Sequence, residues 1–169
     1  ADNPYRAIMV NNLGLVYESM YKYDLSLKYY LRAMELTEQT LGKDHPRYAI
    51  RLHNVANILK KQEKFQAALE YDLQAVAINE KHYGKNQRLY ILSIFGLLGD
   101  YTSLKQYDKA LKISEELLAY IANNPENITP EIFDFRQSIG YLYYKAGMNE
   151  RAFQITKETL RNADPCFQP

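Results

Sequence analysis

The sequence repeats itself with a period of 42 residues. Pro4 and Pro46 are one period apart, and Pro130 follows two periods later. Further columns of the repeat hold aromatic or small residues, namely Tyr17, Tyr101 and Tyr143, then Tyr23, Phe65 and Tyr107, and then Ser26, Ala68, Ala110 and Ala152. A fixed period of this length is typical of proteins that stack copies of one supersecondary unit. We expect four units, at about residues 7–48, 49–90, 91–132 and 133–165.

Each unit is predicted to be a pair of antiparallel helices. In the first unit, apolar residues recur every three or four positions, at Val10, Leu13 and Tyr17 in the first half and at Leu27, Tyr30 and Met34 in the second. This spacing is that of one face of a helix. Small residues such as Gly14 and Ser26 allow the two helix axes to approach closely. The chain is therefore predicted to be all-α.

The segment between two units carries signals that end one helix and start the next. Gly42 suits the position just after a helix, where the backbone often takes a positive φ. Asp44 and His45 are capping candidates, and Pro46 suits the first turn of the following helix. Residues 2–4 resemble the middle of such a linker. We therefore expect the chain to be a piece of a longer protein with additional repeats or an effector domain.

Composition limits the classes of partner. The chain carries 21 Lys and Arg against 20 Asp and Glu. A balance this even argues against a surface built to bind nucleic acid or anionic lipid, and no stretch approaches the ~18 apolar residues of a membrane span. The single cysteine, Cys166, cannot form an internal disulfide. We expect a cytoplasmic location, with the bacterial periplasm as the alternative.

The sequence offers little that would support catalysis. His45, His53 and His82 are not spaced with Cys, Asp or Glu in the way that metal ligands are. Gly96 and Gly99 lie inside a predicted helix, and the Lys and Ser or Thr of a phosphate-binding loop do not follow them. We therefore expect no enzymatic activity, no metal and no cofactor.

One face of each first helix has no partner inside its own unit. At 100° per residue, with the seventh residue of a unit (Leu13 in the first) taken as pointing inward, a stripe of positions lies on the opposite side. We expect this stripe, with the position at its edge, to form a ligand-binding groove. The predicted groove residues are Asn11, Asn12, Leu15, His53, Asn54, Asn57, Lys60, Lys61, Phe95, Tyr141, Tyr144 and Lys145.

The repeat resembles the tetratricopeptide repeat. The segment LGKDHPRYA at residues 41–49, followed by Asn54, Ala56, Phe65 and Ala68, is similar to the kinesin light chain type of that family, which includes bacterial relatives. The resemblance covers essentially the whole chain and is weakest in the third unit, where HYGKNQRLY lacks the proline. It implies a right-handed α-α superhelix whose concave side holds peptides or partner proteins, without catalysis.

Two asparagines of the groove suggest how it binds. Asn12 and Asn54 are one repeat apart, and members of the kinesin light chain type place asparagines at this point. An amide side chain both donates and accepts, so the two residues could hold a peptide backbone whatever its sequence. The alternative is that they bond neighbouring turns or solvent.

Charged and aromatic residues of the groove suggest what it binds. Lys60 and Lys61 lie beside His53 in the one unit with excess positive charge, which suggests an acidic group on the ligand. The alternative is that both lysines are solvated at a helix end. Tyr141 and Tyr144 would anchor apolar side chains of a ligand, unless a further unit covers them.

The leading hypothesis is a non-catalytic scaffold that binds a protein or an extended peptide. A chaperone carboxylate clamp is disfavoured for the first unit, because family members with that clamp have Lys and Asn where this chain has Asn11 and Leu15. One alternative is a regulatory sensor region that binds a signal peptide and controls an attached effector domain. Another is a spacer or self-assembly surface.

Overall fold

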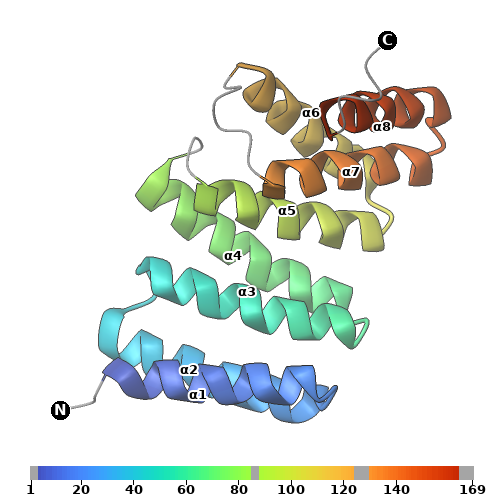
Figure 1. Ribbon diagram of the computed structural model, residues 1–169. Coiled ribbons are helices and arrows are strands. Elements are labelled where there is room, and N and C mark those ends of the chain that lie inside the picture. Colours follow the sequence, from blue (N-terminus) through green and yellow to red (C-terminus); the bar gives the residue numbers. More distant parts are fainter. Residues whose placement is uncertain (1–3, 85–87, 124–129, 164–169) are drawn as a thin grey trace. The chain divides into compact units, whose positions relative to one another are not determined.

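The computed structural model describes residues 4–84, 88–123 and 130–163 of the chain. The elements in this part are helices: α1 (Pro4–Ser19), α2 (Tyr23–Leu41), α3 (Pro46–Lys61), α4 (Phe65–Tyr83), α5 (Arg88–Ser103), α6 (Tyr107–Asn123), α7 (Pro130–Lys145) and α8 (Asn149–Ala163). Each predicted unit therefore overlaps one pair of helices, whose first helix begins three residues before the predicted start of the unit. The all-α helical-repeat fold that the sequence predicts is confirmed (Figure 1).

The chain divides into two compact units, with the boundary within α5. The first ends at Asp100 and the second begins at Tyr101. In the first unit, α1 packs on α2, α2 packs on α3, and α3 packs on α4. In the second unit, α7 packs on both α6 and α8. The prediction that all four helix pairs form one array remains a prediction.

The turn inside each helix pair has the same backbone conformation. One residue per turn has a positive φ: Tyr21 (58°), Glu63 (59°), Lys105 (58°) and Gly147 (78°). These four positions are one period apart, although glycine, the residue that takes this conformation most easily, occurs in only one of them. The repeat therefore imposes the backbone geometry even where the side chain disfavours it.

The linker between the first two pairs is built as predicted. Gly42 has a φ of 82° and follows α2 directly. His45 caps α3, because its Nδ1 accepts a hydrogen bond from the backbone N–H of Arg47 at 3.1 Å, and Pro46 occupies the first turn. The corresponding residues ahead of the fourth predicted unit, Thr129 and Pro130, fall outside the residues whose side chains are described.

The core of the first compact unit lies between α2, α3 and α4. One cluster of buried residues contains Tyr30, Val55, Ala56, Ile58, Leu59 and Ala68. A second contains Tyr48, Ala49, Leu52 and Ala75. Most of these side chains come from α3, which is covered by α2 on one side and by α4 on the other. In this unit, the outer helix α1 packs mainly on α2 and reaches α3 through polar contacts.

The small-residue columns hold the helices of a pair close together. The hydroxyl of Ser26 on α2 donates to the backbone oxygen of Gly14 on α1 at 2.9 Å, and the ring of Tyr30 fills the space beside Gly14. The prediction that the seventh residue of a unit points inward is wrong in the first unit, since Leu13 is 46% exposed and Gly14 is buried, whereas Val55, Leu97 and Ile139 in the same column are buried. In the first unit, the inward direction is therefore one residue, or about 100°, away from the predicted one.

Candidate functional site

The predicted asparagines of α1 and α3 meet in a single hydrogen bond. The amide nitrogen of Asn54 donates to Oδ1 of Asn11 at 2.8 Å and so links the two first helices of the first compact unit. Asn12 is exposed and takes no part in this bond. Asn11 and Asn54 are both predicted groove residues, but Asn54 is paired with Asn11 and not with Asn12, the residue one repeat earlier.

The remaining uncharged groove residues of this unit are accessible in part. Leu15 on α1 and Phe95 on α5 are exposed, and Asn57 on α3 is half-buried. Ile50, which lies on the same predicted stripe of α3, is also exposed. These side chains give the surface around the asparagine pair a mixed apolar and amide character.

Beneath the predicted groove lies a buried cluster of charged residues. Lys60 on α3 donates to Oδ2 of Asp72 on α4 at 2.7 Å, and its Nζ is 3.5 Å from Oδ1 of Asp100 on α5. His53 completes the cluster, with its Nδ1 3.0 Å from Oδ1 of Asp72. Asp72 is 1% exposed and Asp100 is fully buried. The cluster therefore connects three helices through side chains that carry charge.

A glycine makes room for this cluster. A Cβ atom added to Gly96 on α5 would lie 3.0 Å from both Oδ2 of Asp72 and Cε1 of His53. The sequence marks Gly96 only as a helix-weakening residue. Its place in the structure gives a reason for it, because any side chain here would press on the ion cluster.

The two buried carboxyl groups have opposite ionisation properties. Burial alone would raise the pKa of Asp72, but hydrogen bonds and charge from His53 and Lys60 outweigh it and lower that pKa from its ordinary value. Burial raises the pKa of Asp100 to about 8; the Lys60 charge opposes the rise, and a hydrogen bond with Asp72 and its negative charge add to it. The surroundings therefore favour the ionised form of Asp72 and the protonated form of Asp100.

Asp72 and Asp100 were absent from the predicted site. Each occupies a repeat column in which another unit has an uncharged residue, Tyr30 in the case of Asp72 and Ile58 in the case of Asp100. The available signal was an acid in a column whose other members are uncharged, namely Tyr30, Ser114 and Thr156 beside Asp72, and Val16, Ile58 and Leu142 beside Asp100. It marks a departure from the repeat and not a feature of the repeat itself.

Both lysines of the predicted basic spot have carboxylate partners in the chain. Lys60 is paired within the buried cluster, and Lys61 lies 3.1 Å from Oε1 of Glu18 on α1. Glu18 also accepts a hydrogen bond from the hydroxyl of Tyr30 at 2.7 Å. The chain itself thus supplies counterions for both lysines, and the acidic ligand stays a prediction.

The predicted aromatic residues of α7 form a separate patch in the second compact unit. Tyr141 and Tyr144 are both exposed, and their ring centroids are 6.5 Å apart. Nζ of Lys145 lies 5.2 Å from the centroid of the Tyr141 ring. Two exposed aromatic rings beside a cation offer a contact surface for an apolar or aromatic side chain.

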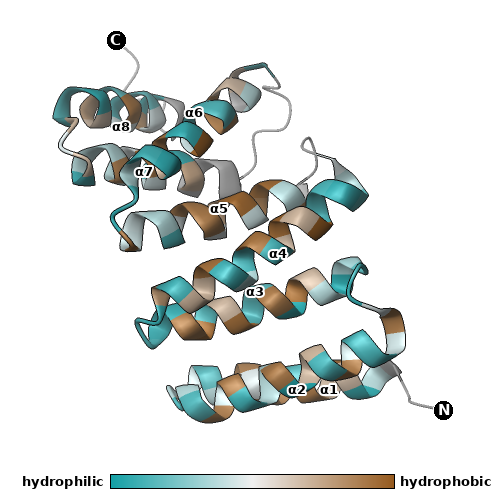
Figure 2. Cartoon of the chain, turned by 180° about the vertical axis from the view of Figure 1, so that it is seen from behind, coloured by the Kyte–Doolittle hydropathy of each residue, from teal (hydrophilic) through white to brown (hydrophobic). Residues whose placement is uncertain are grey.

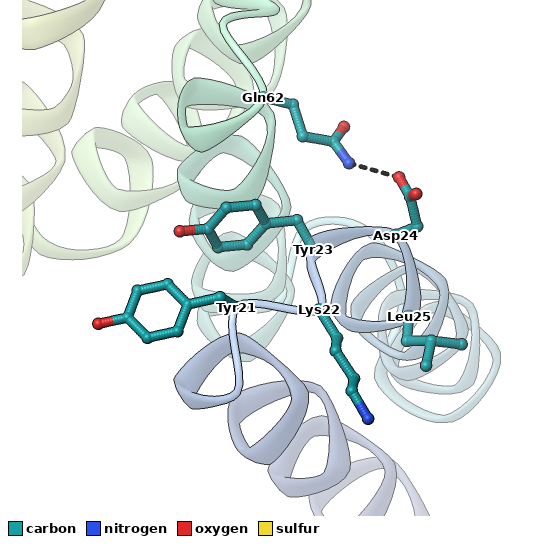
Figure 3. Close-up of a pocket in the computed structure, with 6 residues that line it drawn as sticks. All are labelled: Tyr21, Lys22, Tyr23, Asp24, Leu25 and Gln62. Atoms are coloured by element: carbon teal, nitrogen blue, oxygen red, sulfur yellow. Dashed lines mark hydrogen bonds between the residues drawn. The ribbon is translucent and has the colours of Figure 1, made fainter.

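A shallow pocket of about 500 Å³ lies at the turn between α1 and α2. Its lining residues are Tyr21, Lys22, Tyr23, Asp24, Leu25 and Gln62. In Figure 3 the rings of Tyr21 and Tyr23 point to one side, while the amide of Gln62 donates to Asp24 at 2.8 Å on the other. The lining includes none of the predicted groove residues, so this pocket is distinct from the groove.

The described residues carry no arrangement that suggests metal chemistry or membrane insertion. Within residues 4–84, 88–123 and 130–163, no group of three or more His, Cys, Asp and Glu side chains is placed to share a metal ion. In the same ranges, no helix combines the length and the apolar character that a bilayer crossing requires. Cys166, the remaining candidate for special chemistry, lies outside the described residues.

Known structures share this fold at low sequence identity. The kinesin light chain TPR-like repeats of Podosopora anserina are 18% identical, with a TM-score of 0.79 over 94% of this chain and 75% of that one. BtubC from P. vanneervenii is 21% identical, with a TM-score of 0.85 over 95% and 65%. The apo form of RapI is 19% identical, with a TM-score of 0.80 over 98% and 58%. The chain thus spans about two thirds of BtubC and somewhat less of RapI.

Sequence comparison gives the family directly. No curated protein matches the sequence. A family model described as the tetratricopeptide repeat matches residues 5–81 and 52–123, which together cover more than half of the chain. The chain therefore belongs to the tetratricopeptide repeat family, whose helical scaffolds generally bind other proteins and generally have no catalytic function of their own.

Proposed function

We propose that the first compact unit binds an extended segment of a partner protein along α1 and α3, and that it does so mainly through the segment's backbone. The observation that carries this proposal is the hydrogen bond from Asn54 to Asn11. It holds two amide side chains in one fixed orientation on the surface between the two first helices.

The bond leaves complementary groups available to a ligand. Asn54 uses its amide nitrogen, so its Oδ1 can still accept, and Asn11 uses its oxygen, so its Nδ2 can still donate. Within the described residues, neither of these two atoms has a hydrogen-bond partner. An extended backbone presents N–H and C=O groups side by side, which matches one acceptor beside one donor.

His53 adds a third polar group to the same surface. Its Nδ1 is held at 3.0 Å by Asp72, which fixes the orientation of the ring. Its other ring nitrogen has no partner in the described part of the chain, and the side chain is 37% exposed. Leu15 and Ile50, both exposed, provide apolar contacts for side chains of the bound segment.

The test compares variants that differ only in the asparagine pair. Peptides selected from a random phage-displayed library against the unaltered chain are measured by calorimetry on N11A/N54A, and on N12A as the matched control. Loss of two hydrogen bonds should weaken binding by about 10-fold or more in the double variant. N12A should bind as the unaltered chain does, because Asn12 is outside the pair.

Two results would contradict the proposal. Selected peptides that bind N11A/N54A with unchanged affinity would show that the asparagine pair is not the site. Equal losses in N12A and N11A/N54A would point to a general effect on α1. The regulatory alternative, in which peptide binding controls an effector domain, stays a prediction, and so does a ligand contact at Tyr141 and Tyr144.

A further inference from the structure

His53 has one ring nitrogen turned into the fold and one that a ligand can reach. Its Nδ1 lies 3.0 Å from Oδ1 of the buried Asp72 on α4. Its Nε2 has no partner among the described residues and is not buried, and the side chain as a whole is 37% exposed. Figure 2 shows that hydrophilic residues recur along α3 between apolar ones. His53 is next to Asn54, so a segment bound at the asparagine pair would also meet Nε2.

The neighbours of Asp72 decide which nitrogen of His53 carries the proton. Lys60 donates to Oδ2 of Asp72 at 2.7 Å, and its charge favours the ionised carboxylate. Burial would raise the pKa of Asp72, but hydrogen bonding by His53 and the charge of Lys60 outweigh it and lower that pKa. An ionised carboxylate can only accept hydrogen bonds, so Nδ1 of His53 must be the donor to Oδ1.

A proton fixed on Nδ1 makes Nε2 an acceptor. An uncharged imidazole carries a proton on one nitrogen only, and the hydrogen bond of the first nitrogen sets the role of the second. Nε2 of His53 therefore offers a lone pair to the groove. An O–H or N–H group of a ligand can donate to it, whereas a carboxylate would face it with lone pair against lone pair. A carboxylate would also come near the negative charge of Asp72 on the far side of the ring.

We propose that His53 selects the bound segment by its side-chain chemistry: the segment presents a hydrogen-bond donor to Nε2, as a hydroxyl, an amide N–H or an ammonium group does, and a carboxylate at this position is excluded. Asp72 is a positioning residue for this choice, because it fixes the proton of His53 while it is itself buried. This selection rests on the proposed function, since it concerns the segment that Asn11 and Asn54 would hold. It is the opposite of the acidic group that the charge of the unit predicts.

The position of the proton can be measured in the chain without a ligand. NMR of nitrogen-labelled imidazole rings, at about pH 8 where an ordinary imidazole is uncharged, distinguishes a protonated ring nitrogen from a bare one. The signals of His53 are identified by their loss in His53→Gln, since His45 and His82 are the other histidines of the chain. We expect a protonated Nδ1 and a bare Nε2. A proton on Nε2, whether on it alone or on both nitrogens, would overturn the proposal.

Exchange of one carboxylate for an amide should move the proton. In Asp72→Asn, Lys60 requires the amide oxygen, so the amide nitrogen faces His53 and donates to Nδ1. Nε2 then carries the proton and becomes a donor. Asp100→Asn is the matched control, because Asp100 joins the same buried cluster through Lys60. It should leave the proton of His53 on Nδ1, whereas a merely structural role of Asp72 would leave it there in both variants.

The ligand side is tested with peptides selected from a random phage-displayed library on the unaltered chain. They should share one position with Ser, Thr, Asn, Gln, Lys or Arg, and Asn at that position is compared with Asp, which has the same shape but cannot donate. The Asp peptide should bind the unaltered chain about 10-fold or more weakly than the Asn peptide does. The preference should disappear in His53→Ala and reverse in Asp72→Asn. Selected peptides with Asp or Glu at that position would overturn the proposal in favour of an acidic ligand.

The double variant N11A/N54A separates this proposal from the proposed function. If N11A/N54A loses the peptides while the Asn and Asp peptides bind the unaltered chain equally well, selection by His53 is overturned and the proposed function stands. If N11A/N54A binds the peptides as the unaltered chain does, both are overturned, even where NMR places the proton on Nδ1.

Discussion

The first two helix pairs place different chemistry at the same two repeat positions. Between α1 and α2, the hydroxyl of Tyr30 donates to Glu18 at 2.7 Å. One period later, between α3 and α4, Lys60 donates to Asp72 at the same distance. The repeat thus fixes the two positions at which a polar contact joins the helices of a pair. The residue types at these positions decide how strongly the stability of the pair depends on charge.

The difference matters because the second contact belongs to a larger network. Glu18 needs one counterion and has it in Lys61. Lys60, in contrast, lies between two buried carboxyl groups, and neither oxygen of Asp100 accepts a hydrogen bond from a described residue. The stability of a buried, low-dielectric site with two acids and one lysine depends both on the presence of the cation and on pH.

The two contacts should differ most in the stability that is lost when each of them is broken. Lys60→Met should lower the free energy of unfolding by about 3 kcal/mol at pH 7, because it leaves Asp72 ionised in a buried site without its nearest cation. Glu18→Gln should cost less than about 1 kcal/mol, since the glutamine oxygen can still accept from Tyr30. Urea unfolding followed by circular dichroism measures both values. Equal losses would mean that the two contacts are energetically alike.

The two helix pairs also differ in the small residue of the first helix that allows the helices to approach closely. In the first pair, Gly14 faces Tyr30, and a Cβ on Gly14 would lie 2.6 Å from a ring carbon; in the second pair Ala56 occupies the same column. Gly14→Ala should therefore lower the free energy of unfolding by about 2 kcal/mol through overpacking.

A second glycine provides the control for that substitution. Nothing lies within 4 Å of a Cβ built on Gly99, which is also inside a helix. Gly99→Ala should raise the free energy of unfolding by about 0.5–1 kcal/mol, the usual gain in helix propensity. Thermal and urea unfolding distinguish the two signs. A stabilising Gly14→Ala would show that the Tyr30 ring moves freely, against the packing described above.

The same comparison shows what the sequence could and could not predict. Gly14 and Ser26 were recognised as close-contact residues because they recur in columns, and a period is visible in one sequence. The inward direction of α1 was misassigned by one residue, since a period gives spacing and not the angle at which a helix meets its neighbour.

The buried charges escaped prediction for a different reason. Lys60 and Lys61 were predicted to be available to a ligand because charge was counted unit by unit, whereas their partners Asp72, Asp100 and Glu18 lie on other helices. Ion pairing depends on which side chains lie close together in the fold. A count of charges in each unit does not give that information. The asparagine pair shows the same limit, since its two members come from different helices.

Removing the second buried acid, Asp100, should raise the free energy of unfolding by an amount that depends on pH. Asp100 has a pKa of about 8 in the folded chain, against an ordinary value of 3.8, so the folded state holds its proton more tightly than the unfolded state does. Its contribution to stability is complete below about pH 4, falls as pH rises, and is lost above about pH 8. Asp100→Asn imitates the protonated acid and can still donate to Asp72.

The variant Asp100→Asn should therefore match the unaltered chain near pH 4 and exceed it by about 2 kcal/mol at pH 9. Urea unfolding at a series of pH values measures the difference between the two chains. A difference that is independent of pH would show that Asp100 is ionised throughout and that Lys60 balances it fully. Ile58 occupies the same column one repeat earlier and is uncharged. The packing of the second helix pair on the first should therefore show no such pH dependence.

The smallest effect is expected at a buried arginine that distinguishes α3 from α1. Arg51 is 8% exposed, and its Nε has no hydrogen-bond partner in the described part of the chain. Burial, with the nearby charge of Arg47, lowers its pKa. The same column on α1 holds Met9. Arg51→Met should raise the free energy of unfolding by about 1 kcal/mol, because an apolar side chain of similar length avoids the cost of a buried, unpaired cation.

The exposed Arg47 is the control for this substitution. Arg47→Met should change the free energy of unfolding by less than about 0.5 kcal/mol, as is usual for a surface position. A loss of stability in Arg51→Met, with no change in Arg47→Met, would mean that Arg51 gains more from its surroundings than its missing partner indicates. A gain would show that the packing of α3 on α2 tolerates the arginine without depending on it, and that an apolar side chain at this position is the more stable choice.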